Sequence, residues 1–180
     1  MPFTFPVRKE SDEVYYADCG IVRIGLGDLD ELKRIALGNP RRRARLCTHG
    51  APSDLLHEMF IVHARDAYVR PHRHLLRREG MTVLEGEADM ILFNDDGKVT
   101  GVSPMNTKQF YQRMNIPIYH MQLIRSDVLV FHEATSGPFD RVGTEFAPWS
   151  PSDDDRPAVS DYIHQLEREI RPFLHGRPLP

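Results

Sequence analysis

Two histidines and one glutamate near the middle of the chain have the types and the spacing of a metal-binding triad. A single residue separates His72 from His74, so both imidazoles point to the same side if this segment is a β-strand. A short turn after His74 would let Glu79 begin a neighbouring strand and face them. Two imidazole nitrogens and a carboxylate suit Fe, Zn, Mn, Ni or Co, with positions left open for water or substrate. The triad therefore predicts one divalent transition metal ion.

The residues around the triad have the pattern of short antiparallel strands. From Tyr68 to Val102, apolar runs alternate with turn sequences. Asn94-Asp95-Asp96-Gly97 is a strong hairpin signal, and Gly86 lies in another predicted turn. We expect residues 68–102 to form a β-meander within a small barrel or jelly roll.

Further strands and two helices flank this meander. The runs of β-branched and aromatic residues that predict strands are 14–24, 44–49, 57–64, 116–124 and 127–133. Residues 27–40 and about 160–173 have apolar residues at helical spacing, and Ser160 is the expected cap of the second helix. Residues 104–115 are polar and predict irregular structure.

These elements indicate one mainly β domain with an N-terminal helix and a C-terminal helix. A chain of 180 residues can bury a sizeable core. We expect four segments: an N-terminal arm and strands (1–26), a helix (27–40), a β-barrel (41–151), and a C-terminal helix and tail (152–180). The first 13 residues are polar with two prolines, which predicts an arm that is mobile or swapped onto a partner.

A cluster of arginines lies just before the predicted barrel, at Arg41-Arg42-Arg43-Ala44-Arg45. A guanidinium group is a rigid fork that binds phosphate or carboxylate. Such a cluster is also typical of a solvated rim at the start of a strand. If residues 44–49 form a strand, Arg45 and His49 lie on one face, and either can point into the cavity of the triad.

Composition and charge narrow the class of protein. Hydrophobic residues make up 41% and charged residues 27% of the chain, and the net charge is −3. These values are ordinary for a water-soluble domain and give no overall basic field for nucleic acid or an anionic membrane. Cys19 and Cys47 show no disulfide pattern. No secretory leader and no apolar run of roughly 20 residues is present, so a cytoplasmic location is the default prediction.

The triad and its surroundings resemble the first motif of the cupin superfamily. That motif has His-x-His, three or four residues, Glu, six residues and Gly. In this chain the four positions are His72, His74, Glu79 and Gly86. The second cupin motif has a proline shortly before a histidine, and Pro117-Ile118-Tyr119-His120 is similar. The resemblance implies a single cupin domain, a small jelly-roll β-barrel, with His120 as a fourth metal ligand.

A longer set of segments resembles the WbuC-type cupin metalloproteins. The resemblance extends from about Arg41 to Pro151 and includes Phe93-Asn94-Asp95-Asp96-Gly97, Gly137-Pro138-Phe139 and Phe146-Ala147-Pro148-Trp149. WbuC-type cupins are associated with bacterial gene clusters for O-antigen and other polysaccharides. The resemblance implies a metal site and, as for other cupins, a homodimer, but it implies no particular reaction.

Three functions are compatible with these residues. The first is a metal-dependent isomerase or epimerase that acts on a sugar or nucleotide-sugar derivative, with the ion as a Lewis acid. Arg45 and His49 would bind this small-molecule substrate, and His49 or Glu133 would move the proton. The second is an Fe(II)-dependent dioxygenase, because the ligand set leaves two adjacent positions for substrate and O₂. The third is a non-catalytic module that binds or senses a small molecule through its metal.

Overall fold

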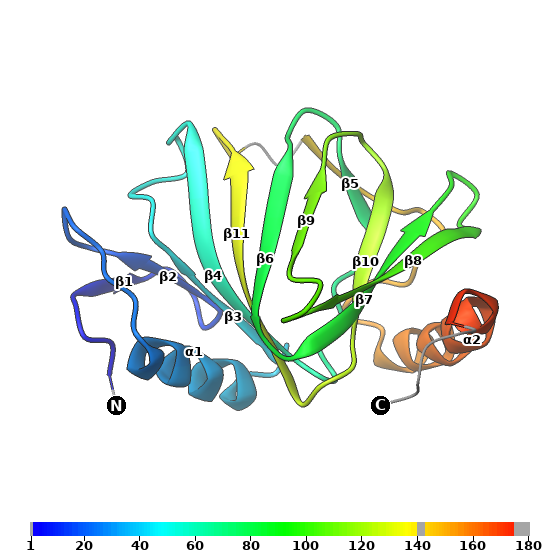
Figure 1. Ribbon diagram of the computed structural model, residues 1–180, viewed down its shortest axis with the longest axis horizontal. Coiled ribbons are helices and arrows are strands. Elements are labelled where there is room, and N and C mark those ends of the chain that lie inside the picture. Colours follow the sequence, from blue (N-terminus) through cyan, green and yellow to red (C-terminus); the bar gives the residue numbers. More distant parts are fainter. Residues whose placement is uncertain (1, 140–142, 175–180) are drawn as a thin grey trace.

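Two β-sheets face each other in the computed structural model, which describes residues 2–139 and 143–174 (Figure 1). From edge to edge, the first sheet consists of β1 (Val7–Lys9), β2 (Val14–Ala17), β3 (Arg43–Cys47), β4 (Leu56–Ala64), β11 (Val128–Ser136), β6 (Glu79–Glu85) and β9 (Tyr111–Met114). The second consists of β12 (Thr144–Phe146), β5 (His72–His74), β10 (Tyr119–Ile124), β7 (Glu87–Phe93) and β8 (Val99–Asn106). The predicted mainly β fold is confirmed, although no strand pairing within the described ranges closes the two sheets into a barrel.

Both predicted helices are present and cover the outer faces of the sheets. Helix α1 (Leu26–Gly38) packs Leu32 against Leu46 and Val62 of the first sheet. Helix α2 (Arg156–Leu174) packs Leu166 and Ile170 against the second sheet. In Figure 1 the two helices lie on opposite sides of the sandwich. Both helices thus bury an apolar stripe, which is the main source of stability for a helix in a folded protein.

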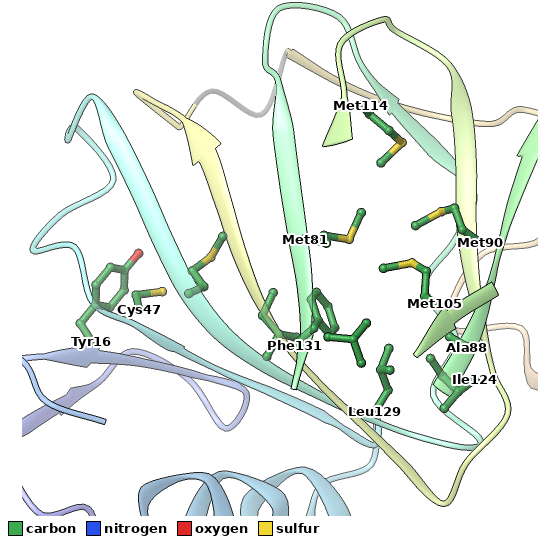
Figure 2. Close-up of a cluster of buried hydrophobic side chains, with 13 residues drawn as sticks. Tyr16, Cys47, Met81, Ala88, Met90, Met105, Met114, Ile124, Leu129 and Phe131 are labelled. Carbon is green, nitrogen blue, oxygen red and sulfur yellow. The ribbon is translucent and has the colours of Figure 1, made fainter. Parts of the chain in front are cut away.

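The space between the sheets is filled by side chains that alternate along the strands, and methionine is prominent among them (Figure 2). The methionines of this core are Met59, Met81, Met90, Met105 and Met114. Unbranched thioether side chains fill irregular spaces between sheets. Met114 of this core also lines the pocket that contains predicted metal ligands, so the core and the predicted metal site are adjacent.

The chain passes from the first sheet to the second at Gly86, between β6 and β7. Gly86 has φ +82°, a conformation that glycine adopts without steric cost. The predicted meander over residues 68–102 is therefore wrong. Only β7 and β8 form a hairpin there, whereas β6 pairs with β9 and β11, and β5 pairs with β10 and β12. Alternation of apolar residues predicts strands, but it does not predict which strands pair.

Several predicted boundaries also differ from the structure. Residues 104–115 are not irregular, because β8 extends to Asn106 and β9 forms an edge strand whose exposed side chains weaken the apolar pattern. Helix α2 begins before Ser160, where the Asp155 carboxylate accepts the Ala158 N–H at 3.1 Å. The first residues are not a free arm, since β1 pairs with β2 of the same chain. The end of the predicted tail, residues 175–180, lies outside the described residues.

Candidate metal centre

Three histidines from two neighbouring strands of the second sheet converge. His72 and His74 lie on β5, and His120 on β10 is the direct antiparallel partner of His72. One ring nitrogen from each histidine lies within 4.8 Å of the others. The β5–β6 and β9–β10 connections next to these strands lie at the same end of the sandwich, at the top of Figure 1. A group of three imidazoles at this spacing can hold a metal ion.

Glu79 reaches the same group from the facing sheet. It is the first residue of β6, and its Oε1 lies 3.0 Å from His120 Nε2 while its Oε2 lies 3.2 Å from His74 Nε2. The side chain is almost completely buried, with a residue exposure of 4%. The sequence predicted that Glu79 would begin a strand beside the histidine strand, whereas the chain crosses between sheets at this turn. The structure nevertheless brings all four predicted ligands together.

The ring orientations fit a cation between the imidazoles and the carboxylate. Nδ1 of His72 and Nδ1 of His120 each lie 2.9 Å from a backbone carbonyl oxygen, that of Arg70 and that of Ile118. A carbonyl only accepts, so each Nδ1 carries the hydrogen and each neutral ring keeps a lone pair on Nε2. Glu79 Oε1 is buried and accepts no hydrogen bond from the described residues. A lone pair cannot face a carboxylate at this distance without a positive charge, which either a proton on His120 Nε2 or a bound cation supplies. Three imidazoles and a carboxylate are a donor set that suits a divalent cation.

Electrostatics keep His72 and Glu79 in the states that bind metal. Burial alone would lower the pKa of His120, but the Glu79 carboxylate outweighs burial and raises it, so a metal ion at this site would displace a proton. Burial, together with the neighbouring His120 and His74, lowers the pKa of His72 to about 3. Burial alone would raise the pKa of Glu79, but interactions with His120 and His74 outweigh it and hold that pKa well below its usual range. At neutral pH, His72 is therefore a neutral nitrogen donor and Glu79 is ionised.

The short strand β5 is held in place by contacts on its outer side. Arg73, between the two β5 histidines, binds Glu145 at 3.0 Å and Asp95 at 2.7 Å, and its guanidinium lies 4.4 Å from the centre of the Tyr119 ring. The Trp149 indole N–H donates to the Asp95 carbonyl oxygen at 3.0 Å. Asp95, in the turn between β7 and β8, thus binds both Arg73 of the histidine strand and Trp149 of the Ala-Pro-Trp segment noted in the sequence.

A pocket opens beside the four predicted ligands. Its lining consists of His74, Arg77, Glu79, Met114, Ile116, Ile118 and His120. Arg77 was not identified from the sequence, where it was taken only as part of the turn before Glu79. Its guanidinium donates to the Thr144 hydroxyl and lies 5.0 Å from the centre of the Phe139 ring. The sequence signal that could have identified Arg77 is its position, two residues before a predicted ligand.

The predicted substrate-binding residues Arg45 and His49 are not among the described residues that line this pocket. Arg45 is exposed on β3. His49 lies beyond the end of β3, where its ring stacks on His57 with 4.1 Å between centroids. Burial lowers the pKa of His49. Their roles in substrate binding and catalysis stay predictions.

Glu133, the other predicted catalytic residue, is half-buried on the inner face of the first sheet and, like Arg45 and His49, is not among the described residues that line the pocket. Its direct cross-strand neighbours are Met59 and Met81, which belong to the core between the sheets, and paired residues share a face. Burial and then the negative charge of Glu79 raise the pKa of Glu133, which reaches about 8 although Arg45 opposes the shift. A carboxyl group with this pKa can gain or lose a proton near neutral pH.

The raised pKa predicts how Glu133 affects stability in the metal-free protein. Because the pKa rises from 4.5 to about 8 on folding, the folded state holds an extra proton between these values. The stabilisation is complete below about pH 4.5 and is lost as the pH rises through about 8. We expect Glu133→Gln to become more stable relative to wild type between pH 5 and pH 8. Urea denaturation with a chelator present measures this difference.

The matched control is Glu169→Gln, because Glu169 is exposed on α2. This substitution removes a carboxyl group from the surface instead of from between the sheets. Parallel pH profiles for wild type and Glu133→Gln would contradict the assignment of a protonated carboxyl group to Glu133.

Comparisons with known proteins agree with this fold. A family profile described as "Domain of unknown function (DUF6016)" matches residues 24–105. No curated protein matches the chain significantly. An uncharacterized conserved protein with a double-stranded β-helix domain from Klebsiella pneumoniae is similar, with 14% identity and a TM-score of 0.52 over 72% of this chain and 98% of that one. The fold is a cupin-type double-stranded β-helix.

A second protein of similar fold has a name that states its function. The capsular polysaccharide assembling protein CapF from Staphylococcus aureus is 12% identical, with a TM-score of 0.51 over 60% of this chain and 32% of CapF. The chain thus spans about a third of CapF's length. These likenesses confirm the predicted cupin fold, and the WbuC-type resemblance stays a prediction. None of the described helices is long and apolar enough to cross a membrane.

Proposed function

We propose that this cupin is a metal-dependent isomerase or epimerase that acts on a sugar or nucleotide-sugar derivative in polysaccharide synthesis. The observation that carries the proposal is the convergence of His72, His74, His120 and Glu79. Glu133 is the candidate for the base, because the charge of Glu79 acts on its carboxyl group. The name of the neighbour CapF, a capsular polysaccharide assembling protein, supports the choice of pathway.

The residues divide the chemistry between them. The three histidines and Glu79 would hold the ion, which when bound supplies Lewis-acid polarisation of substrate oxygens. Glu133 would take a proton from a hydroxyl-bearing carbon next to a carbonyl group, and the electron pair would move onto the carbonyl oxygen. Isomerisation follows when the proton returns to the former carbonyl carbon, while the hydroxyl oxygen loses its proton and the former carbonyl oxygen gains one. Epimerisation follows when a proton returns to the first carbon from its opposite face. No oxidant or second substrate is consumed, and the same carboxyl group would serve both steps.

Solvent isotope exchange tests the proposal. The metal-loaded protein is incubated with a panel of nucleotide sugars in D₂O, and mass spectrometry detects deuterium on carbon. We expect exchange with wild type and at least about 100-fold slower exchange with Glu133→Gln. Oxygen consumption by the Fe(II) form without exchange would overturn the proposal in favour of a dioxygenase. Binding with neither exchange nor oxygen consumption would overturn it in favour of a non-catalytic binding module.

A further inference from the structure

We infer that a second pocket, between helix α2 and the β7–β8 turn, binds a small organic cation that carries an alkylammonium group. This α2 pocket has a volume of about 190 Å³ and shares no described lining residue with the pocket beside the predicted metal ligands. The inference is therefore independent of the proposed function. The lining residues that carry it are Asp96 and Gly97 of the turn, Trp149, and Tyr162, Gln165 and Glu169 of α2.

The indole ring of Trp149 has a fixed position in the α2 pocket. Its N–H donates to the Asp95 carbonyl oxygen at 3.0 Å. The backbone of Gly97 lies against the ring, since a Cβ at Gly97 would be 2.7 Å from Trp149 Cδ2. The Phe93 and Tyr119 rings pack around it, with centroids 5.0 and 5.7 Å away. A ring that is already held in place offers an aromatic surface to a ligand at little cost in conformational entropy.

The charged groups in the lining are negative. Asp96 is exposed and makes no hydrogen bond or ion pair with any of the described residues. Glu169 accepts a hydrogen bond from the Gln165 amide at 2.7 Å. No lysine, arginine or histidine is among the described lining residues. An unpaired carboxylate beside aromatic rings favours a cation, because the face of an aromatic ring carries partial negative charge.

The size and the chemistry of the pocket favour an organic cation over other ligands. A cavity of about 150 Å³ in another protein holds benzene, so the α2 pocket can hold a trimethylammonium group with a short substituent. The two carboxylates would repel an anion. A hard metal ion needs several oxygen ligands, whereas Trp149 and Tyr162 supply aromatic carbon. An alkylammonium group spreads its charge over a carbon-rich surface and so matches both the rings and Asp96.

Tryptophan fluorescence tests the inference at the pocket itself, because Trp149 is the only tryptophan in the chain. Choline chloride is the probe, and its uncharged counterpart is the dimethylbutanol in which carbon replaces the nitrogen of choline. Sodium chloride keeps the ionic strength equal in the two titrations. We expect a saturable change in emission with choline and at least about 10-fold weaker binding of the alcohol, which lacks the attraction of a cation to the rings and to Asp96.

Two variants place the ligand in the α2 pocket. Asp96→Asn should weaken choline binding at least about threefold, as expected for the loss of an exposed ion pair. Its matched control is Asp161→Asn, because Asp161 is exposed on α2 outside the described lining, and its affinity should stay within about twofold of wild type. Gln165→Lys puts a positive charge into the lining and should abolish the saturable change.

The emission maximum of each free variant shows whether Trp149 keeps its wild-type surroundings. Equal responses to choline and to the alcohol would overturn the inference, as would the lack of a saturable response to choline in wild type. Wild-type affinity for choline in Asp96→Asn would also overturn it. None of these results depends on metal content, so they leave the proposed function to its own test.

Discussion

Replacing Glu79 with alanine is expected to lower the affinity for a divalent metal ion at least about 100-fold. Even substitution of residues that only hydrogen-bond to metal ligands typically lowers the metal affinity about 10- to 100-fold. Glu79 approaches His120 at 3.0 Å and His74 at 3.2 Å from the facing sheet. It is the carboxylate of the predicted ligand set, and its loss leaves three neutral donors. Competition with a chromophoric chelator measures the affinity.

The fold should survive this change, since the apolar core between the sheets does not include Glu79. Glu169→Ala is the control, because it removes a glutamate that is exposed on α2, and it should bind metal as wild type does. Wild-type affinity in Glu79→Ala would show that Glu79 is not a ligand.

The second large effect is expected at the turn between the sheets. Gly86→Ala should destabilise the protein by about 3 kcal/mol or more. A Cβ at Gly86 would lie 2.1 Å from the Val128 carbonyl oxygen and 2.4 Å from Ser126 Oγ, and φ is +82°. The first contact is with backbone, which cannot rotate away, so the turn or β11 must shift. Urea denaturation measures the free energy of unfolding.

Gly101→Ala provides the comparison within the same fold. A Cβ at Gly101 would lie 3.7 Å from Leu92 Cδ1, an ordinary contact, so the change should alter stability by less than about 1 kcal/mol. If Gly86→Ala proved as stable as Gly101→Ala, the close turn between β6 and β7 would be described incorrectly.

The parts of the site that depend on local sequence were predictable. His72 and His74 share a face because side chains alternate along a strand, and this needs no knowledge of the fold. His120 came from the resemblance to a cupin motif, since nothing local to Pro117 and His120 indicates that β10 lies beside β5. The two helices were also predicted, because apolar residues at helical spacing form one buried stripe.

The remaining features depend on which strands pair. Strand pairing is set by contacts between residues far apart in the chain, and local sequence patterns do not predict it. Glu79 was expected beside the histidine strand, but it reaches the imidazoles from the opposite sheet. Arg77 looked like a turn residue, and its partner Thr144 is 67 positions away in the chain. The homodimer, the cytoplasmic location and the roles of Arg45 and His49 remain predictions.

The central claim is that this chain holds one divalent metal ion through three histidines and a glutamate. The most direct test is elemental analysis of protein purified without a metal-affinity step, before and after loading with Fe, Zn, Mn, Ni or Co, alongside Glu79→Ala. We expect about one ion per wild-type chain and a large loss in the variant. Iron at this level in the purified protein would direct attention to oxygen chemistry, and the other metals would favour isomerisation. A wild-type protein that retains no more metal than Glu79→Ala would contradict the account.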